Sequence, residues 1–356
     1  MRSKTLLFVS VAVIALAGAA ITQTKAPATG PYHYLKTIQI GGEGGWDYAA
    51  TDEAGRRIYV THGTKVIVID IDKDEVVGEI TDTPGAHGFA IAPELGLGFS
   101  SNGSESKASI VDLKTLKTIS KVDTGQNPDG ILYIPGVQEV YTFNRSRTAP
   151  SATVFEAKSG KVITTITLPG TPEFAVVDVK AGRVYNNIDS KSEVVVIDIK
   201  THEIVATWPS APGEGGSGMA IDLQNHRLFL GCDNLMVMMD SATGKVVDSV
   251  PIGAGVDANR FDPATKLAFA SCGGTGSVTI AREESAERLT VVQTLETARG
   301  ARTMTLDPKT HKIYLAAVDY QPAPPTPPAG TPPGRGGRAP AVPNSFKVLV
   351  YGMEGK

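Results

Sequence analysis

A short hydrophobic run that ends in an acidic residue recurs along this chain with an almost constant spacing. Five copies are clear, and they end at Asp70, Asp112, Glu156, Asp198 and Asp240. Consecutive copies lie 42, 44, 42 and 42 residues apart, and two weaker copies follow near Ala281 and Gly352. A period of about 40 to 45 residues, built from several short β-branched runs, is typical of one four-stranded blade per repeat. The sequence therefore predicts an all-β fold, a seven-bladed β-propeller.

Each repeat divides into four hydrophobic runs separated by Gly, Pro, Asn and Asp, and such runs predict strands. The innermost predicted strands start at Asp47, His87, Asp129, Glu173, Ser217, Asp257 and Arg302. The last repeat lacks its fourth strand, whereas residues 34–40 match that strand and have no repeat of their own. We expect this N-terminal strand to complete blade seven, because it would cover an open sheet edge and close the ring.

The ends of the chain and one insertion differ from the repeats. Arg2 and Lys4 precede an apolar run that is short for a membrane span, and small residues follow it. We expect a signal peptide over 1–20, a flexible mature N-terminus over 21–32 and a single propeller over 33–356. The predicted protein is a monomer, periplasmic or secreted, that does not span a membrane. Residues 321–343 are rich in Pro and Gly and predict an irregular insertion in blade seven.

Charge and cysteine content limit the partners and the covalent structure. Removal of Arg2 and Lys4 with the signal peptide changes the formal net charge from −3 to −5, which gives no basic surface for nucleic acid. Cys232 and Cys272 occupy equivalent positions on adjacent repeats. Equivalent atoms of neighbouring blades are expected roughly 10 Å apart, beyond the ~7 Å Cα limit for a disulfide. Both cysteines are therefore predicted to be free thiols.

The second and third strands of several repeats share a recognisable pattern. Residues 57–63 read RIYVTHG and residues 65–70 read KVIVID, with similar segments at 183–187, 194–198 and 312–315. The chain resembles the exported bacterial seven-bladed propellers of the YVTN-repeat, YncE-like group, from Tyr34 to Gly352. The resemblance implies a fold more than a function, because the matching residues are structural. One branch of the group is associated with single-stranded DNA, which implies basic and aromatic surfaces that this chain does not supply.

The predicted inner strands place polar side chains around one end of the central channel. The candidate ligand-binding residues there are Asp47, His87, Asp129, Glu173, Asp257 and Arg302 at strand starts, with Trp46, His62, Asn102 and Asn144 beside them. Loops that converge on one face of a rigid scaffold commonly bind ligands. We therefore expect a binding module whose acidic mouth takes a small molecule, a glycan or a protein. A structural role is the other interpretation, in which the carboxylates accept backbone hydrogen bonds and Arg302 pairs with Asp47.

A metal site at the same mouth gives an alternative function. His87, Asp129, Glu173 and Asp257 are suitable ligands for a divalent cation such as Ca²⁺. An ion over the channel would indicate a divalent-metal-dependent propeller hydrolase or lactonase. The sequence contains no haem-attachment, nucleophile-elbow, phosphate-loop or HExxH motif. No catalytic residue is assigned, and a binding function is favoured over enzyme activity.

Overall fold

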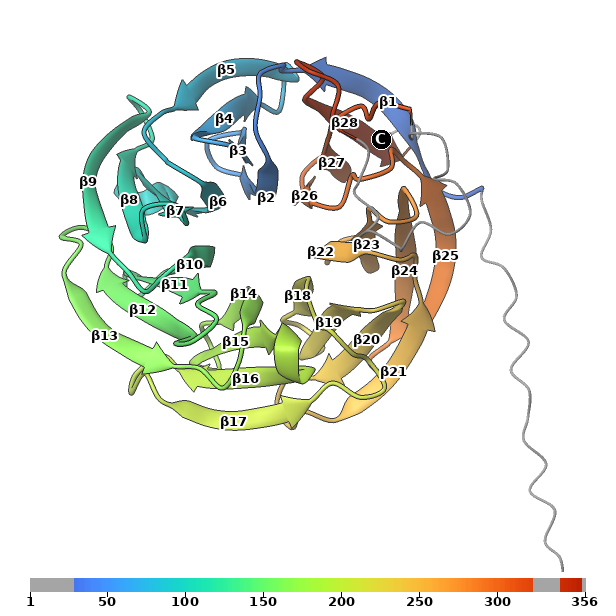
Figure 1. The fold of residues 1–356 in the computed structure, drawn as a ribbon. Helices are drawn as coiled ribbons and strands as arrows, with labels where there is room; N and C mark the ends of the chain where they lie inside the picture. Colours follow the sequence, from blue (N-terminus) through green and yellow to red (C-terminus); the bar gives the residue numbers. More distant parts are fainter. Residues whose placement is uncertain (1–28, 323–339, 354–356) are drawn as a thin grey trace, which may run out of the picture.

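The computed structural model describes residues 29–322 and 340–353, and these form a closed ring of seven four-stranded antiparallel sheets around a central channel (Figure 1). The predicted seven-bladed propeller is confirmed. Blades one to three are β2 (Trp46–Asp52), β3 (Arg57–His62), β4 (Lys65–Asp70) and β5 (Glu75–Ile80); β6 (Ala86–Ala92), β7 (Leu97–Asn102), β8 (Lys107–Asp112) and β9 (Lys117–Asp123); and β10 (Pro128–Ile134), β11 (Glu139–Asn144), β12 (Ser151–Glu156) and β13 (Val162–Thr167).

The remaining blades repeat this order from the channel outward. Blades four to six are β14 (Pro172–Asp178), β15 (Arg183–Ile188), β16 (Glu193–Asp198) and β17 (Ile204–Pro209); β18 (Met219–Asp222), β19 (Arg227–Cys232), β20 (Leu235–Asp240) and β21 (Val246–Pro251); and β22 (Val256–Asp262), β23 (Leu267–Cys272), β24 (Ser277–Ser285) and β25 (Arg288–Glu296). Blade seven is β26 (Met304–Asp307), β27 (Lys312–Ala317), β28 (Lys347–Met353) and β1 (Tyr32–Gln39). Two single-turn 3₁₀ helices, η1 (Pro93–Leu95) and η2 (Asp189–Lys191), follow β6 and β15.

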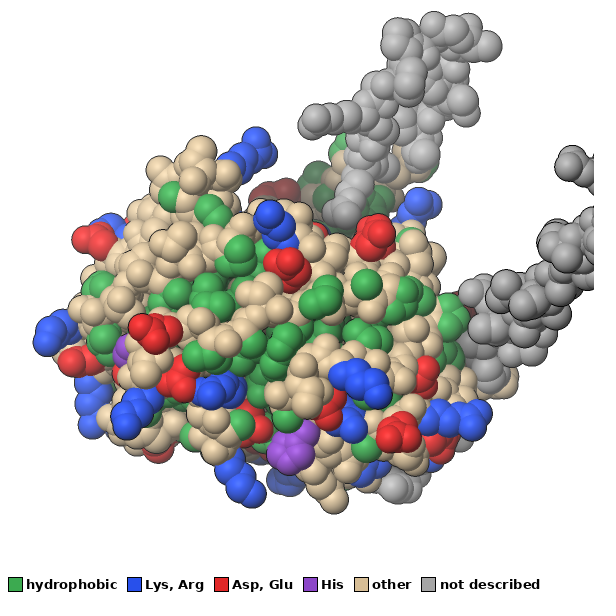
Figure 2. Space-filling view, turned by 90° about the horizontal axis from the view of Figure 1, so that it is seen from below, with side chains coloured by type: hydrophobic (Ala, Val, Ile, Leu, Met, Phe, Trp, Pro, Cys, Tyr) green, Lys and Arg blue, Asp and Glu red, His purple; other side chains and the backbone are tan. Residues whose placement is uncertain are grey.

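The hydrophobic core lies between neighbouring blades. Second and third strands such as β3 and β4 are buried on both faces, because a blade packs against each side of them. Ile58 and Val60 of blade one, for example, share a cluster with Tyr314 and Val348 of blade seven. Outer strands alternate between partly buried and exposed residues, as β17 does. Figure 2 accordingly shows hydrophobic side chains interspersed with charged ones on the surface of the molecule.

The ring closes through its N-terminal strand, as predicted. β1 pairs antiparallel with β28 and is the outer strand of blade seven. It begins at Tyr32, two residues before the expected start, and Tyr32 is only 2% exposed. The backbone N–H of Tyr32 donates to Gln293 Oε1, and Gln293 donates in return to the carbonyl of Tyr32. β1 therefore pairs with β28 within blade seven and also connects this blade to blade six.

The structure also bears on the predictions for the cysteines, for membrane-spanning helices and for the irregular segments. Cys232 and Cys272 are free and buried, as predicted. Within the described part of the chain, no helix has the length and apolarity needed to cross a membrane. The expected signal peptide over 1–20 and most of the insertion over 321–343 lie outside the described residues.

Candidate functional site

Five inner strands carry a β-bulge at the same level of the channel. The bulges interrupt the register of β2, β6, β10, β14 and β22. The bulged segments contain Asp47, His87, Asp129, Glu173 and Asp257, respectively. A bulge bends its strand and changes the direction of a side chain, and bulges are common beside functional sites. These irregularities explain how charged residues of five blades meet at one end of the channel.

His87 lies between two carboxylates from the blades on either side of its own. Its Nδ1 is 2.7 Å from Asp47 Oδ2 and 3.2 Å from Asp129 Oδ1. Burial lowers the pKa of His87, but the hydrogen bond to Asp47 and the charges of Asp129 and Asp47 outweigh it, and the net shift is upward. The raised pKa favours the protonated form of His87, and its contacts link blades one, two and three.

Arg145 is a functional candidate that the sequence did not reveal. It follows β11 directly and lies between two inner strands, with Nη1 2.6 Å from Glu173 Oε1 and 3.3 Å from Asp129 Oδ2. Its Nη2 is 3.9 Å from Asp189 Oδ2. The neighbouring carboxylates outweigh the effect of burial and raise the pKa of Arg145. Arg145 therefore joins blade three to blade four at the mouth.

Arg302 completes the ring of charges on the opposite side. Its Nε donates to Asp257 Oδ2 at 2.6 Å, whereas its Nη2 is 3.9 Å from Asp47 Oδ1. The expected pairing with Asp47 is therefore present but is the longer of the two. Arg302 also donates to the carbonyl of Trp46 and lies 5.8 Å from the centre of the Trp46 ring. We call Asp47, His87, Asp129, Arg145, Glu173, Asp257 and Arg302 the charged belt.

The carboxyl groups of the charged belt outnumber its cations by four to three, and the excess is reflected in their pKa values. Burial, followed by the charge of Asp47, raises the pKa of Asp129 to about 7. The same two causes raise the pKa of Asp257 to about 6. Burial and the charge of Asp129 raise the pKa of Glu173 well above its usual value. The raised pKa values favour a proton on these carboxyl groups near neutral pH, and a bound cation would displace it.

Four of the expected mouth residues have their main contacts outside the belt. Asn102 donates to Glu105 and Ser109, and Asn144 donates to Ser151 and Thr153, all within their own blades. His62 is buried, donates from Nδ1 to the carbonyl of Gly45, and stacks on Phe346 at 3.9 Å between ring centres. Trp46 packs on the same phenylalanine ring at 5.8 Å and borders the belt through Arg302.

The structure divides the four expected metal ligands. His87 and Asp129 do lie together, and with Asp47 their ligand atoms are all within 4.8 Å of one another. Glu173 and Asp257 are instead paired with Arg145 and Arg302, respectively. A cation bound by all four expected ligands would have to displace both arginines. Among the described residues, the geometry therefore fits an ion at the Asp47, His87 and Asp129 side of the belt.

We expect the protein to become more stable as the pH falls from about 7 to about 5. Unfolded carboxyl groups titrate near pH 4, so across this window the folded state binds more protons at Asp129 and Asp257 than the unfolded state does. The raised pKa of His87 acts in the same direction, because its stabilisation is complete at low pH and is lost as the pH rises through the folded value. The expected gain is about 1–3 kcal/mol, measured by urea denaturation.

A variant separates the belt from other groups that titrate in this range. Burial lowers the pKa of His62, so its protonation in the unfolded state opposes the belt on acidification. The D129N/D257N double variant should lose the contribution of these two carboxyl groups and keep that of His62. Equal pH slopes for the variant and the natural protein would contradict the expectation.

Comparisons with known proteins support the architecture without naming a family. No protein-family model matches the chain, and no curated protein matches it. A solved structure titled Kuenenia stuttgartiensis hydrazine synthase is similar, with a TM-score of 0.66 and 15% sequence identity over 83% of this chain and 96% of that chain. At this level of identity the likeness concerns the fold alone. The chain is thus a seven-bladed β-propeller with a charged belt at one end of its channel.

Proposed function

We propose that this protein is an exported binding protein of the YVTN-repeat, YncE-like group, and that its charged belt binds a positively charged group of a small ligand. The observation that carries the proposal is the excess of carboxyl groups in a belt assembled from several blades. Three of these carboxyl groups have raised pKa values. A ligand cation replaces the retained proton and lowers those pKa values. A glycan or a protein partner would be recognised by the same chemistry, through an amino group.

The paired arginines favour an organic cation over a metal ion. Arg145 and Arg302 each bind one oxygen of Glu173 and Asp257, and the hydroxyls of Tyr48 and Ser217 contact the other oxygens, so these residues do not offer a full coordination shell. An ammonium group needs only a few oxygen acceptors at hydrogen-bond distance, and it can share them with arginine. Export is supported by Arg2, Lys4 and the apolar run after them.

The alternative function is a divalent-metal-dependent hydrolase or lactonase. It is favoured by one observation, the close grouping of ligand atoms from Asp47, His87 and Asp129. There the residues would hold the ion with two carboxylates and one imidazole, and such an ion supplies a polarised water or carbonyl. The two functions make opposite predictions about which cation binds and whether a chelator matters.

Isothermal titration of the purified protein with putrescine, Ca²⁺ and Zn²⁺, each in separate experiments, tests the proposal. We expect putrescine to bind with an affinity that rises with pH between about 5 and 8, because binding requires ionised carboxylates. The D129N/E173Q double variant should weaken binding at least about tenfold. The E284Q/E287Q double variant removes two exposed carboxylates from the β24–β25 hairpin and should bind as the natural protein does.

Two other outcomes have a definite meaning. Stoichiometric binding of Ca²⁺ or Zn²⁺ that is reversed by a chelator, without putrescine binding, supports the metal-dependent alternative. Putrescine binding that is equal in D129N/E173Q and E284Q/E287Q contradicts the assignment of the ligand to the charged belt.

A further inference from the structure

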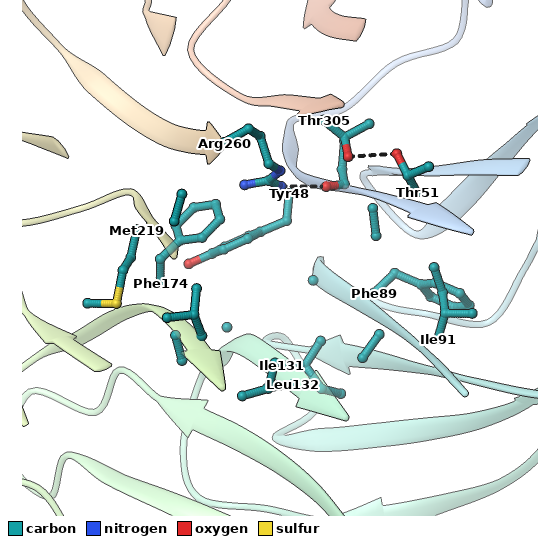
Figure 3. Close-up of a pocket in the computed structure, with 18 of the residues that line it drawn as sticks. Tyr48, Thr51, Phe89, Ile91, Ile131, Leu132, Phe174, Met219, Arg260 and Thr305 are labelled. Atoms are coloured by element: carbon teal, nitrogen blue, oxygen red, sulfur yellow. Dashed lines mark hydrogen bonds between the residues drawn. The ribbon is translucent and has the colours of Figure 1, made fainter. Parts of the chain in front are cut away.

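Below the charged belt the central channel contains a cavity of about 450 Å³, lined by residues of all seven inner strands. Apolar side chains, among them Phe89, Ile91, Ile131, Leu132 and Met219, alternate with polar groups on its walls (Figure 3). A volume of this size lies in the range of small-molecule sites, about 300–1,000 Å³. On five of the inner strands the lining residues follow a belt residue, so the cavity adjoins the belt along the channel.

Arg260 is the cationic side chain among the residues that line this cavity. Arg260 extends from β22 toward Tyr48 and Phe174 (Figure 3). Its Nη1 donates to the carbonyl of Asn259 at 2.7 Å, and its Nη2 donates to the carbonyl of Ala49 at 2.9 Å. The guanidinium carbon is 5.3 Å from the centre of the Phe174 ring. Arg260 therefore crosses the channel from blade six to blade one and rests on an aromatic ring of blade four.

Arg260 has no carboxylate partner among residues 29–322 and 340–353. Arginines placed inside a protein are normally paired, because an isolated charge loses much of its hydration. Desolvation lowers the pKa of Arg260 to about 10. The cavity wall contains one carboxylate, Glu53, but that residue is exposed in the β2–β3 turn beyond the far end of the inner strand and forms no ion pair with Arg260. The guanidinium has donors left for an anion.

We propose that the channel cavity binds a small apolar carboxylate, paired with the guanidinium of Arg260. The planar guanidinium fork matches a carboxylate with two parallel hydrogen bonds. The hydroxyls of Thr51 and Thr305, which bond each other at 2.9 Å on the same cavity wall, are further polar groups for the ligand (Figure 3). The apolar walls take the hydrocarbon part of the ligand. Free phosphate fits less well, because the single guanidinium of Arg260 does not replace the hydration of a doubly charged anion.

The proposal does not depend on the cation site at the belt, since it uses none of the belt residues. The competing explanation is that Arg260 only offsets the negative charge of the belt at a distance. That explanation predicts no ligand in the cavity, and it predicts that loss of Arg260 raises the pKa values of the belt carboxyls further.

Hexanoate, hexanamide and inorganic phosphate are the probes for the test, in calorimetric titrations and thermal unfolding. We expect hexanoate to bind with a Kd of about 1 mM or tighter and to raise the melting temperature, with much weaker effects of the uncharged amide and of phosphate. The R260Q variant should lose hexanoate binding by at least about tenfold. R288Q, which removes an exposed arginine of β25, should bind as the natural protein does.

A second variant keeps the test decisive if R260Q does not fold. Ala50 lines the cavity at the strand level of Arg260, so A50F fills ligand space and retains the arginine. A50F should also weaken hexanoate binding by at least about tenfold. Failure of hexanoate to bind the natural protein, equal binding of hexanamide or phosphate, or unchanged binding by both R260Q and A50F overturns the proposal.

Discussion

Deletion of β1, residues Tyr32–Gln39, is expected to leave little or no folded protein. The strand supplies the fourth sheet position of blade seven, and without it β28 presents an unpaired edge. Tyr32 and Ile38 bury their side chains, which is worth about 1.5–3 kcal/mol each. The bonds between Tyr32 and Gln293 are lost as well. The sum is comparable to the whole stability of a typical domain, about 5–15 kcal/mol.

Circular dichroism and thermal unfolding measure the effect. The matched control starts at Pro31 and therefore lacks only the residues that precede the strand. It should unfold cooperatively at the temperature of the natural protein. A β1-deleted protein that melts like this control would show that the ring does not need its N-terminal strand.

The blade repeat was predictable because its marker residue has a structural task in most blades. Asp70, Asp112, Asp198 and Asp240 each accept hydrogen bonds from the backbone N–H groups two and three residues further on. This contact forms the turn from the third to the fourth strand of the blade. A local interaction of this kind requires the same residue at the same position in each repeat. The sequence therefore shows the fold directly.

The charged belt was predictable only in part. Asp47, Asp129 and Glu173 occupy aligned strand starts, so their shared face follows from the repeat. Arg145 lies in a loop, and its position between Asp129 and Glu173 depends on the packing of two blades. The bulges that direct the belt side chains leave no local signal that we identified in the sequence.

Arg260 and Asn102 show two other limits of sequence interpretation. Arg260 occupies the middle of an inner strand, where the alignment gives the level of the side chain but not its path across the channel. Asn102 ends a second strand as expected, but its amide is used by Ser109 and Glu105 in the adjacent hairpin. Which polar side chains reach the channel is decided by contacts between residues distant in the sequence.

The R56M variant is expected to destabilise the protein by about 3–5 kcal/mol, because it leaves a buried carboxylate without its cation. Arg56, in the turn after β2, donates through Nη1 and Nη2 to the two carboxylate oxygens of Asp307 at 2.9 and 2.8 Å. The Asp307 side chain is 0% exposed. This pair joins blade one to blade seven at the end of the channel opposite the belt. Methionine keeps the apolar stem of the side chain and removes the guanidinium group, with its charge and its hydrogen-bond donors.

Urea denaturation of R56M, D72N and R56M/D307N separates the pair from its surroundings. Asp72 also binds Arg56 but is 57% exposed, so D72N should destabilise the protein far less than R56M does. R56M/D307N should recover part of the loss, since no charge is left uncompensated.

Asp307 also gives the seam between blades one and seven a distinct pH dependence. Burial raises its pKa, but the hydrogen bond from Arg56 outweighs this and lowers it overall. Its stabilisation is therefore present above about pH 4 and is lost as the pH falls through the lowered folded value. The loss of stability in R56M should shrink as the pH falls, beginning above pH 4, because burial raises the pKa of Asp307 once Arg56 is absent. A deficit that stays constant across this range would show that Arg56 stabilises the seam by packing and not by its charge.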